Sequence, residues 1–192
     1  MMEWTEWVIA IVNIVLVIFV FLQVKHTYRP ILMTKILSRE KNVKDDPNVL
    51  EYGDLYSVVS NASPNLASNI KVEYTFLRTG KKLLQIRRRL SYLSPNEATR
   101  EPLAIGEIIT QYPELFEEHS KGDETKKIPK ETLNLILEIQ VRYRFGLLPY
   151  KIRDSYKIEW GSLKNYPDFK DHPILNCWNT RDGHYVYKLN GR

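Results

Sequence analysis

The residues that could do covalent or metal chemistry are few, and they lie near the C-terminus. Cys177 is the one cysteine of the chain, and it stands between His172 and His184. A thiolate nucleophile needs a neighbouring base, and a zinc site needs four ligands, or three and a water. The spacing His-x4-Cys-x6-His is typical of neither site. We therefore interpret Cys177 as a small buried thiol, and we expect no catalytic residue, metal ion or cofactor.

A basic patch flanks one predicted strand and is the first candidate for binding. Such a patch can contact anionic lipid at a membrane surface, at about 1 kcal/mol per charge, or the phosphates of a nucleic acid. Nucleic acid is the weaker interpretation, because no aromatic residues for base stacking are interleaved with the charges. The third interpretation is a solvated strand face with one inward-pointing arginine. The residues are Lys81, Lys82, Arg87, Arg88 and Arg89.

The second candidate for binding is the acidic run PELFEE, residues 113–118. Leu115 and Phe116 could insert into the groove of a protein partner. They could equally be the two apolar residues that an amphipathic turn packs against its own domain. The sequence leaves both interpretations open.

The most informative segment is the apolar run TEWVIAIVNIVLVIFVFLQVKHTYR, residues 5–29. As a helix, its apolar part is about 31 Å long, which matches a hydrocarbon core of about 30 Å. Apolar residues occupy every face, which disfavours a core helix of a soluble domain. A cleaved signal peptide is disfavoured too, because MMEWTE carries no positive charge and no small-residue cleavage site follows. The segment therefore predicts an uncleaved transmembrane helix over residues 7–24.

The charges beside this helix predict its orientation. Glu3 and Glu6 precede it, whereas Lys25, Arg29 and three further Lys or Arg residues follow within about 20 positions. The positive-inside rule then places residues 1–6 outside the cell membrane and the rest of the chain in the cytoplasm.

Several anchor residues have individual roles in this prediction. Trp4 and Trp7 are typical of a membrane interface, and Lys25 and Arg29 of its cytoplasmic side. Asn13 is the polar group near the middle of the span. It could bond to a partner helix, in a homo-oligomer or a larger complex, or simply be tolerated there.

Downstream of the span, apolar residues recur at every second position in several segments. In LILEIQVRYRF, residues 135–145, Leu137, Ile139, Val141, Tyr143 and Phe145 share one face, which predicts a half-buried antiparallel strand. Turn-forming runs such as SNASPN and RTGKK separate these segments. The pattern favours a mainly β fold, an immunoglobulin-like antiparallel sandwich of about seven strands. The predicted strands are 55–61, 69–77, 83–93, 135–145 and 150–160.

The predicted domain boundaries follow from these patterns. Residues 25–48 are a juxtamembrane connector and first strand, with Arg29-Pro30 ending the helix. Residues 49–160 are the sandwich, in which 105–129 form a helical turn and a flexible loop. Residues 161–192 are an aromatic-rich extension packing on the sandwich. Asn61-Ala62-Ser63 is a glycosylation sequon, which we expect to stay unmodified in the cytoplasm.

Three short motifs carry a resemblance to a known group of proteins. They are Tyr28-Arg29-Pro30, the run from Val59 to Val72 (VSNASPNLASNIKV) and Leu93-Ser94-Pro95-Asn96-Glu97. With the preceding span, this layout resembles uncharacterised bacterial and archaeal single-pass membrane proteins with an immunoglobulin-like cytoplasmic domain. In that group the turns read N-x-G-x-G-x-A and L-x-P-G-E, and here Ser63, Asn65 and Asn96 replace the glycines. The resemblance covers residues 5–100 and implies a fold and a topology but no activity.

The function that these observations favour is a membrane-anchored interaction or scaffolding module without catalytic activity. Its partners would be membrane lipid and a protein, and a net charge of +5 suits an anionic lipid surface. The first alternative is an accessory subunit of a larger membrane complex. The second is a membrane-tethered hydrolase or nuclease that uses Cys177 or the basic strand.

Overall fold

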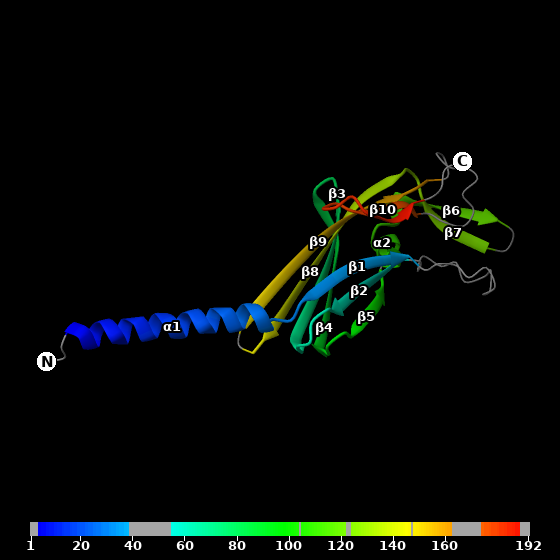
Figure 1. The fold of residues 1–192 in the computed structure, drawn as a ribbon. Coiled ribbons are helices and arrows are strands. Elements are labelled where there is room, and N and C mark those ends of the chain that lie inside the picture. Colours follow the sequence, from blue (N-terminus) through cyan, green and yellow to red (C-terminus); the bar gives the residue numbers. More distant parts are fainter. Residues whose placement is uncertain are drawn as a thin grey trace.

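Helix α1 comprises Trp4–Tyr28, and it projects from one end of a body built of strands (Figure 1). The computed structural model describes residues 4–38, 55–103, 105–121, 124–146, 148–162 and 174–188. Pro30 follows the end of α1, because proline disfavours helical geometry in the residue before it. The helix predicted over residues 7–24 is thus present, and it continues by about one turn into the predicted connector.

The body is mainly β and antiparallel, as the sequence predicts. The described residues contain three sheets: a small sheet in the order β1-β2-β5, a large sheet in the order β11-β10-β9-β8-β3-β4, and the pair β6-β7. The strands are β1 Leu32–Ser38, β2 Leu55–Asn61, β3 Ala67–Arg78, β4 Lys81–Leu93, β5 Ala98–Pro102, β6 Phe116–Lys121, β7 Glu124–Pro129, β8 Leu133–Phe145, β9 Leu148–Trp160, β10 Ile174–Asn179 and β11 Tyr185–Lys188.

The small and large sheets face each other across a shared apolar core. On β8, the alternate residues from Leu133 to Tyr143 are buried, and the residues between them are not. Two hydrogen bonds cross between the sheets: Ser57 Oγ lies 2.9 Å from the Tyr74 hydroxyl, and the Tyr156 hydroxyl donates to the Thr34 carbonyl at 3.3 Å. Burial of each large apolar side chain contributes about 1.5–3 kcal/mol, so this core holds the two layers together.

The segment 105–129 is partly as predicted and partly different. Helix α2, Ile105–Gln111, and the 3-10 turn η1, Pro113–Leu115, supply the predicted helical turns. The prediction of a flexible loop after them is wrong, because β6 and β7 form a hairpin there. This hairpin projects away from the sheets (Figure 1). The hairpin is mostly polar, so it lacks the alternation that identifies a half-buried strand.

The predicted number of strands is also too small, since eleven lie in the described residues. The five long predicted strands are confirmed within two residues at each end. The extra strands are short ones, such as β5 and β10, with too few positions to show a period of two. The charged stretch 39–54 and residues 163–173, which include His172, lie outside the described residues.

Candidate functional site at the N-terminal anchor

The surface of α1 is the most unusual feature of the structure. Residues 4–25 form a helix long and apolar enough to cross a membrane, and none of its strongest apolar window is buried against the body. Trp4 and Trp7 are 84% and 58% exposed, and Asn13 is exposed as well. Soluble proteins rarely leave so large an apolar surface uncovered, so α1 is a candidate membrane anchor.

The junction between α1 and the body is short, and two hydrogen bonds connect it to the body. Only residues 29–31 separate the helix from β1. The Tyr143 hydroxyl of β8 donates to the Pro30 carbonyl at 2.8 Å, and the Ala62 backbone N–H donates to the Ile31 carbonyl at 2.8 Å. Burial raises the pKa of Tyr143, and the nearby charge of Arg29 acts against that rise. The direction of α1 relative to the body is therefore set by both sheets.

The loop after β2 supports this junction through one buried side chain. Asn61 is 1% exposed, and its Nδ2 donates to the carbonyls of Asn65 and Leu93 at 2.7 and 3.1 Å. Its Oδ1 accepts from the backbone and the hydroxyl of Ser63 at 3.2 and 2.7 Å. All four bonding positions of the amide are used. In the folded chain, the asparagine of the sequon therefore lies inside the loop that it organises.

The predicted basic patch does not form a single cluster. Lys81 and Lys82 lie at the start of β4, and Arg87 and Arg89 lie on the outer face of the large sheet, where Arg87 pairs with Glu73 at 3.0 Å. Arg88 points to the other side of the strand and pairs with Glu101 of β5 at 3.5 Å. The interpretation with one inward-pointing arginine describes β4 better. Contact of these residues with lipid stays a prediction.

Of the two interpretations of Leu115 and Phe116, packing against the chain's own domain fits their positions in the structure. Phe116 is 4% exposed, and its ring lies 5.1 Å from that of Trp160 at the end of β9. Leu115 is half-buried and packs against the same core. The two residues anchor the β6-β7 hairpin to the body, which leaves Phe116 unable to enter a partner's groove.

The position of Cys177 in the structure disfavours thiol chemistry. The side chain is fully buried in the core, and that burial raises the pKa of the thiol from 9.0 to about 12. His184 lies in the turn before β11 with its side chain exposed, and His172 is outside the described residues. Within the described ranges, no three His, Cys, Asp or Glu residues are placed to hold a metal ion.

Alkylation provides a direct check on Cys177. A rise of the pKa from 9.0 to about 12 lowers the thiolate fraction at pH 8 by about 1,000-fold. We expect iodoacetamide to label the folded chain at least that much more slowly than the same chain in urea, which is the control. Because the pKa is raised, the neutral thiol stabilises the fold fully below pH 9 and loses this effect as the pH rises toward 12. Fast labelling of the folded chain would contradict this placement.

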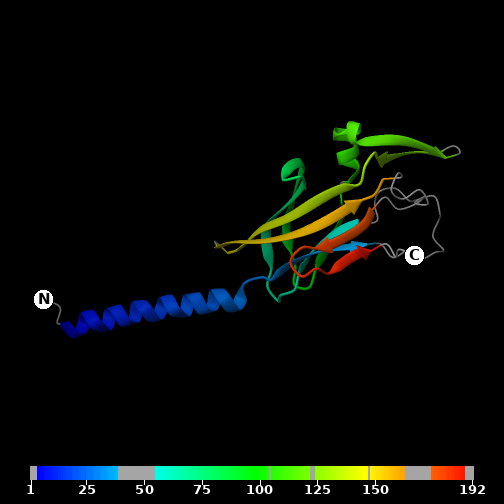
Figure 2. The same ribbon diagram turned by 90° about the horizontal axis from the view of Figure 1, so that it is seen from above.

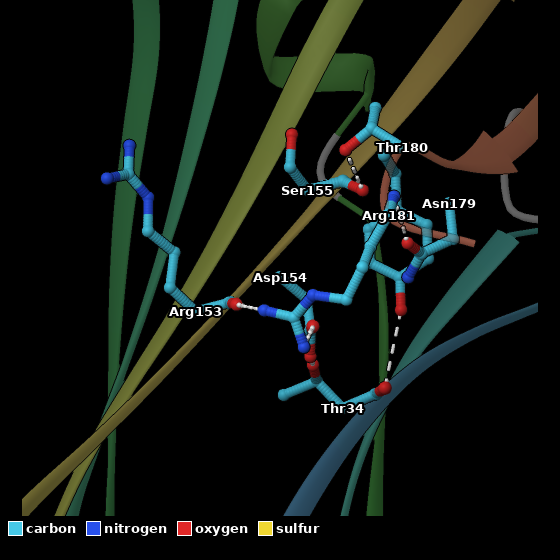
Figure 3. Close-up of polar contacts among 8 residues, drawn as sticks. Thr34, Arg153, Asp154, Ser155, Asn179, Thr180 and Arg181 are labelled. Carbon is cyan, nitrogen blue, oxygen red and sulfur yellow. Dashed lines mark hydrogen bonds and ion pairs between the residues drawn. The ribbon is translucent and has the colours of Figure 1, made fainter. Parts of the chain in front are cut away.

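A polar cluster that the sequence does not predict joins the two sheets and the turn between β10 and β11 (Figure 3). The Asp154 carboxylate of β9 accepts a hydrogen bond from the Thr34 hydroxyl of β1 and lies 3.7 Å from Arg181 Nη1. Arg181 Nη2 also donates to the Arg153 carbonyl at 3.2 Å, and the Thr180 hydroxyl donates to the Ser155 carbonyl at 3.0 Å. These bonds join segments of the protein's own chain to one another. We therefore interpret the cluster as a structural clamp.

Stability measurements can separate the two arms of this clamp. The Asp154 side chain is 18% exposed, whereas that of Arg181 is 77% exposed. Asp154→Ala is expected to lower the free energy of unfolding by about 2 kcal/mol, because it leaves the buried Thr34 hydroxyl without its acceptor. Arg181→Ala is expected to cost at most about 0.5 kcal/mol, as for other surface ion pairs. Urea unfolding of the full chain in mild detergent tests both, and equal losses would contradict the assignment.

Comparison of the chain with protein-family models, with curated protein sequences and with solved structures finds no match. The resemblance of residues 5–100 to the prokaryotic membrane-anchored group therefore stays a prediction. What the chain does has to be argued from α1, its junction and the surface around them.

Proposed function

We propose that the protein is a membrane-anchored interaction module, in which α1 spans the bilayer and the β domain binds a protein partner beside it. The observation that carries this proposal is the uncovered apolar surface of α1, joined to a well-packed body by three residues. A helix of this kind is stable in lipid because all its backbone hydrogen bonds are internal. A water-soluble body attached to it is kept at the membrane surface.

In this proposal the β domain lies in the cytoplasm. Lys25 and Arg29 follow the apolar segment directly, and the acidic Glu6 lies at its other end. The positive-inside rule favours this orientation. The two facing sheets suit an immunoglobulin-like sandwich, a rigid support whose loops and edge strands are the usual sites of protein recognition. The edge strands β4 and β5 of the described sheets are candidates for that role.

A pair of fusions after Arg192 tests the orientation. We expect a green fluorescent protein fusion to fluoresce and an alkaline phosphatase fusion to be inactive, since the phosphatase folds only outside the cytoplasm. The reverse result would overturn the cytoplasmic placement. Crosslinking in intact membranes, followed by affinity purification and mass spectrometry, tests partner binding. The matched control is the isolated α1 fused to an unrelated soluble domain, and a partner recovered equally with that control would overturn recognition by the β domain.

A second candidate function is an accessory subunit of a membrane complex, and one observation favours it. Asn13 lies exposed near the middle of α1, and an amide in the bilayer gains about 1 kcal/mol when it bonds to a neighbouring helix. If this candidate is right, Asn13→Leu should reduce crosslinking to the partner, whereas Val15→Leu should not. A homo-oligomer would instead give crosslinks between copies of this chain.

A further inference from the structure

Four basic side chains from four neighbouring strands lie next to one another on the outer face of the large sheet. The register pairs Lys71 of β3 with Arg89 of β4 and with Arg142 of β8, and it pairs Arg142 with Lys151 of β9. All four side chains are exposed, and the neighbouring residues Ile70, Val72, Val141 and Tyr143 point into the core. We call Arg89, Lys71, Arg142 and Lys151 the basic row.

Among the residues that the structure describes, no ion pair includes a member of the basic row. Like charges placed directly opposite each other destabilise an antiparallel pair. The ion pairs found among the described residues of this face join Arg87 with Glu73 and Arg153 with Glu138, and no member of the row takes part. Burial raises the pKa of Glu73, but hydrogen bonds from Gln85 and Arg87 and the charges of Arg87 and Arg142 lower it overall. An anion from outside the chain would relieve the repulsion along the row.

The row lies at the end of the body from which α1 emerges. Tyr143, the next residue after Arg142, bonds to the Pro30 carbonyl at the junction. Figures 1 and 2 both show the turn between β8 and β9 beside the C-terminal end of α1. In both views the hairpin of β3 and β4 crosses the body on the side nearer α1.

Exposed apolar side chains accompany the charges at this end. Leu66, in the loop that bonds to the Ile31 carbonyl, is 50% exposed, and Tyr92 of β4 is 60% exposed. Tyr92 is paired with Ser68, whose neighbour on the other side is the exposed Arg144. Aromatic and aliphatic side chains that alternate with Lys and Arg suit the boundary between headgroups and acyl chains.

We propose that this end of the β domain, the basic row together with Leu66 and Tyr92, docks on anionic lipid headgroups of the bilayer that α1 crosses. This inference rests on the proposed membrane anchor and adds a second, peripheral contact with the same bilayer. The position of the docking surface indicates lipid as the ligand, because the surface is continuous with the point where α1 leaves the body. A nucleic acid would meet the same charges, but nothing would cover Leu66.

Lipid quenching on the full chain reconstituted into vesicles tests the docking. Leu66→Cys carries an environment-sensitive fluorophore, while the buried Cys177 stays unlabelled, and the vesicles contain a spin-labelled lipid that quenches near the headgroups. We expect quenching at residue 66 in vesicles of phosphatidylcholine with phosphatidylglycerol and much less in phosphatidylcholine alone. A label at Glu131→Cys, an exposed site outside the docking surface, should be quenched in neither.

Charge variants then test the row itself. Arg142→Gln with Lys151→Gln removes two charges and should lower the ratio of docked to undocked chains in anionic vesicles about 30-fold. Lys81→Gln with Lys82→Gln removes the same charge from the start of β4 and should leave the ratio unchanged. Equal losses in the two variants would overturn the row and favour a diffuse charge effect.

Different quenching results would contradict the proposed anchor and the proposed docking. A label at Ile14→Cys, in α1, should be quenched by deep spin-labelled lipid in both vesicle types. Quenching at residue 14 without quenching at residue 66 would overturn the docking and leave the anchor intact. No quenching at residue 14 would overturn the anchor and the docking with it. Binding of short duplex DNA to the full chain in detergent, weakened by Arg142→Gln with Lys151→Gln and accompanied by no quenching at residue 66 in anionic vesicles, would overturn lipid in favour of nucleic acid.

Discussion

Replacing Val12 and Val15 with lysine is expected to remove the chain from the membrane fraction. Both positions lie near the middle of the apolar part of α1, where a lysine costs about 2.5–3.5 kcal/mol. The pair therefore costs about 6 kcal/mol, which is enough to abolish insertion of a single span. The measurement is flotation on a density gradient after carbonate extraction, which separates membrane protein from soluble and aggregated chains.

The matched control places the same two charges at the end of α1. Gln23→Lys with Thr27→Lys adds as much positive charge as the central pair, but these side chains can reach the headgroups. We expect this variant to stay in the membrane. If the central pair also floats after carbonate extraction, α1 does not span the bilayer.

Replacing Asn61 with alanine is expected to lower the free energy of unfolding by about 3 kcal/mol. The substitution removes the donors to the Asn65 and Leu93 carbonyls, and it removes the acceptor for Ser63. Buried groups left without partners cost about 1–3 kcal/mol, and several are affected at once. Urea unfolding of the full chain in mild detergent, followed by tryptophan fluorescence, measures the loss.

Asn65→Ala is the control, because Asn65 contributes its backbone carbonyl to this loop and alanine keeps that carbonyl. It should change the unfolding free energy by less than about 0.5 kcal/mol. A similar loss in both variants would show that the loop tolerates no change in composition, and that the buried amide has no special role.

The sequence predicts the long elements well, because their signals are local. The apolar run of α1 and the alternation in β2 and β8 each lie within one contiguous segment, and the structure places a helix and two strands there. Asn96 stands where the resembled motif has glycine, and its φ of 58° lies in the left-handed region that glycine and asparagine adopt most easily. Ser63 is different, because it bonds to Asn61 and is not among the positive-φ residues of the described chain.

What the sequence does not predict depends on register and burial. The arginines at 87 and 89 look like a patch in the sequence, yet the basic row joins Arg89 to Lys71, Arg142 and Lys151, which come from separate strands. No spacing along the chain could reveal that row before the pairing of four strands was known. Phe116 fails as a docking residue for a similar reason, since its partner Trp160 is far away in the sequence.

The three-residue junction has a mechanical consequence. Because the Pro30 and Ile31 carbonyls each accept a hydrogen bond from the body, the junction restrains bending, and a tilt of α1 favours a tilt of the β domain. A helix longer than the hydrocarbon thickness tilts in a thinner bilayer. The thickness of the surrounding lipid would therefore influence the angle at which the large sheet meets the headgroups, in addition to the lipid charge, so that the position of the β domain would depend on both properties of the bilayer.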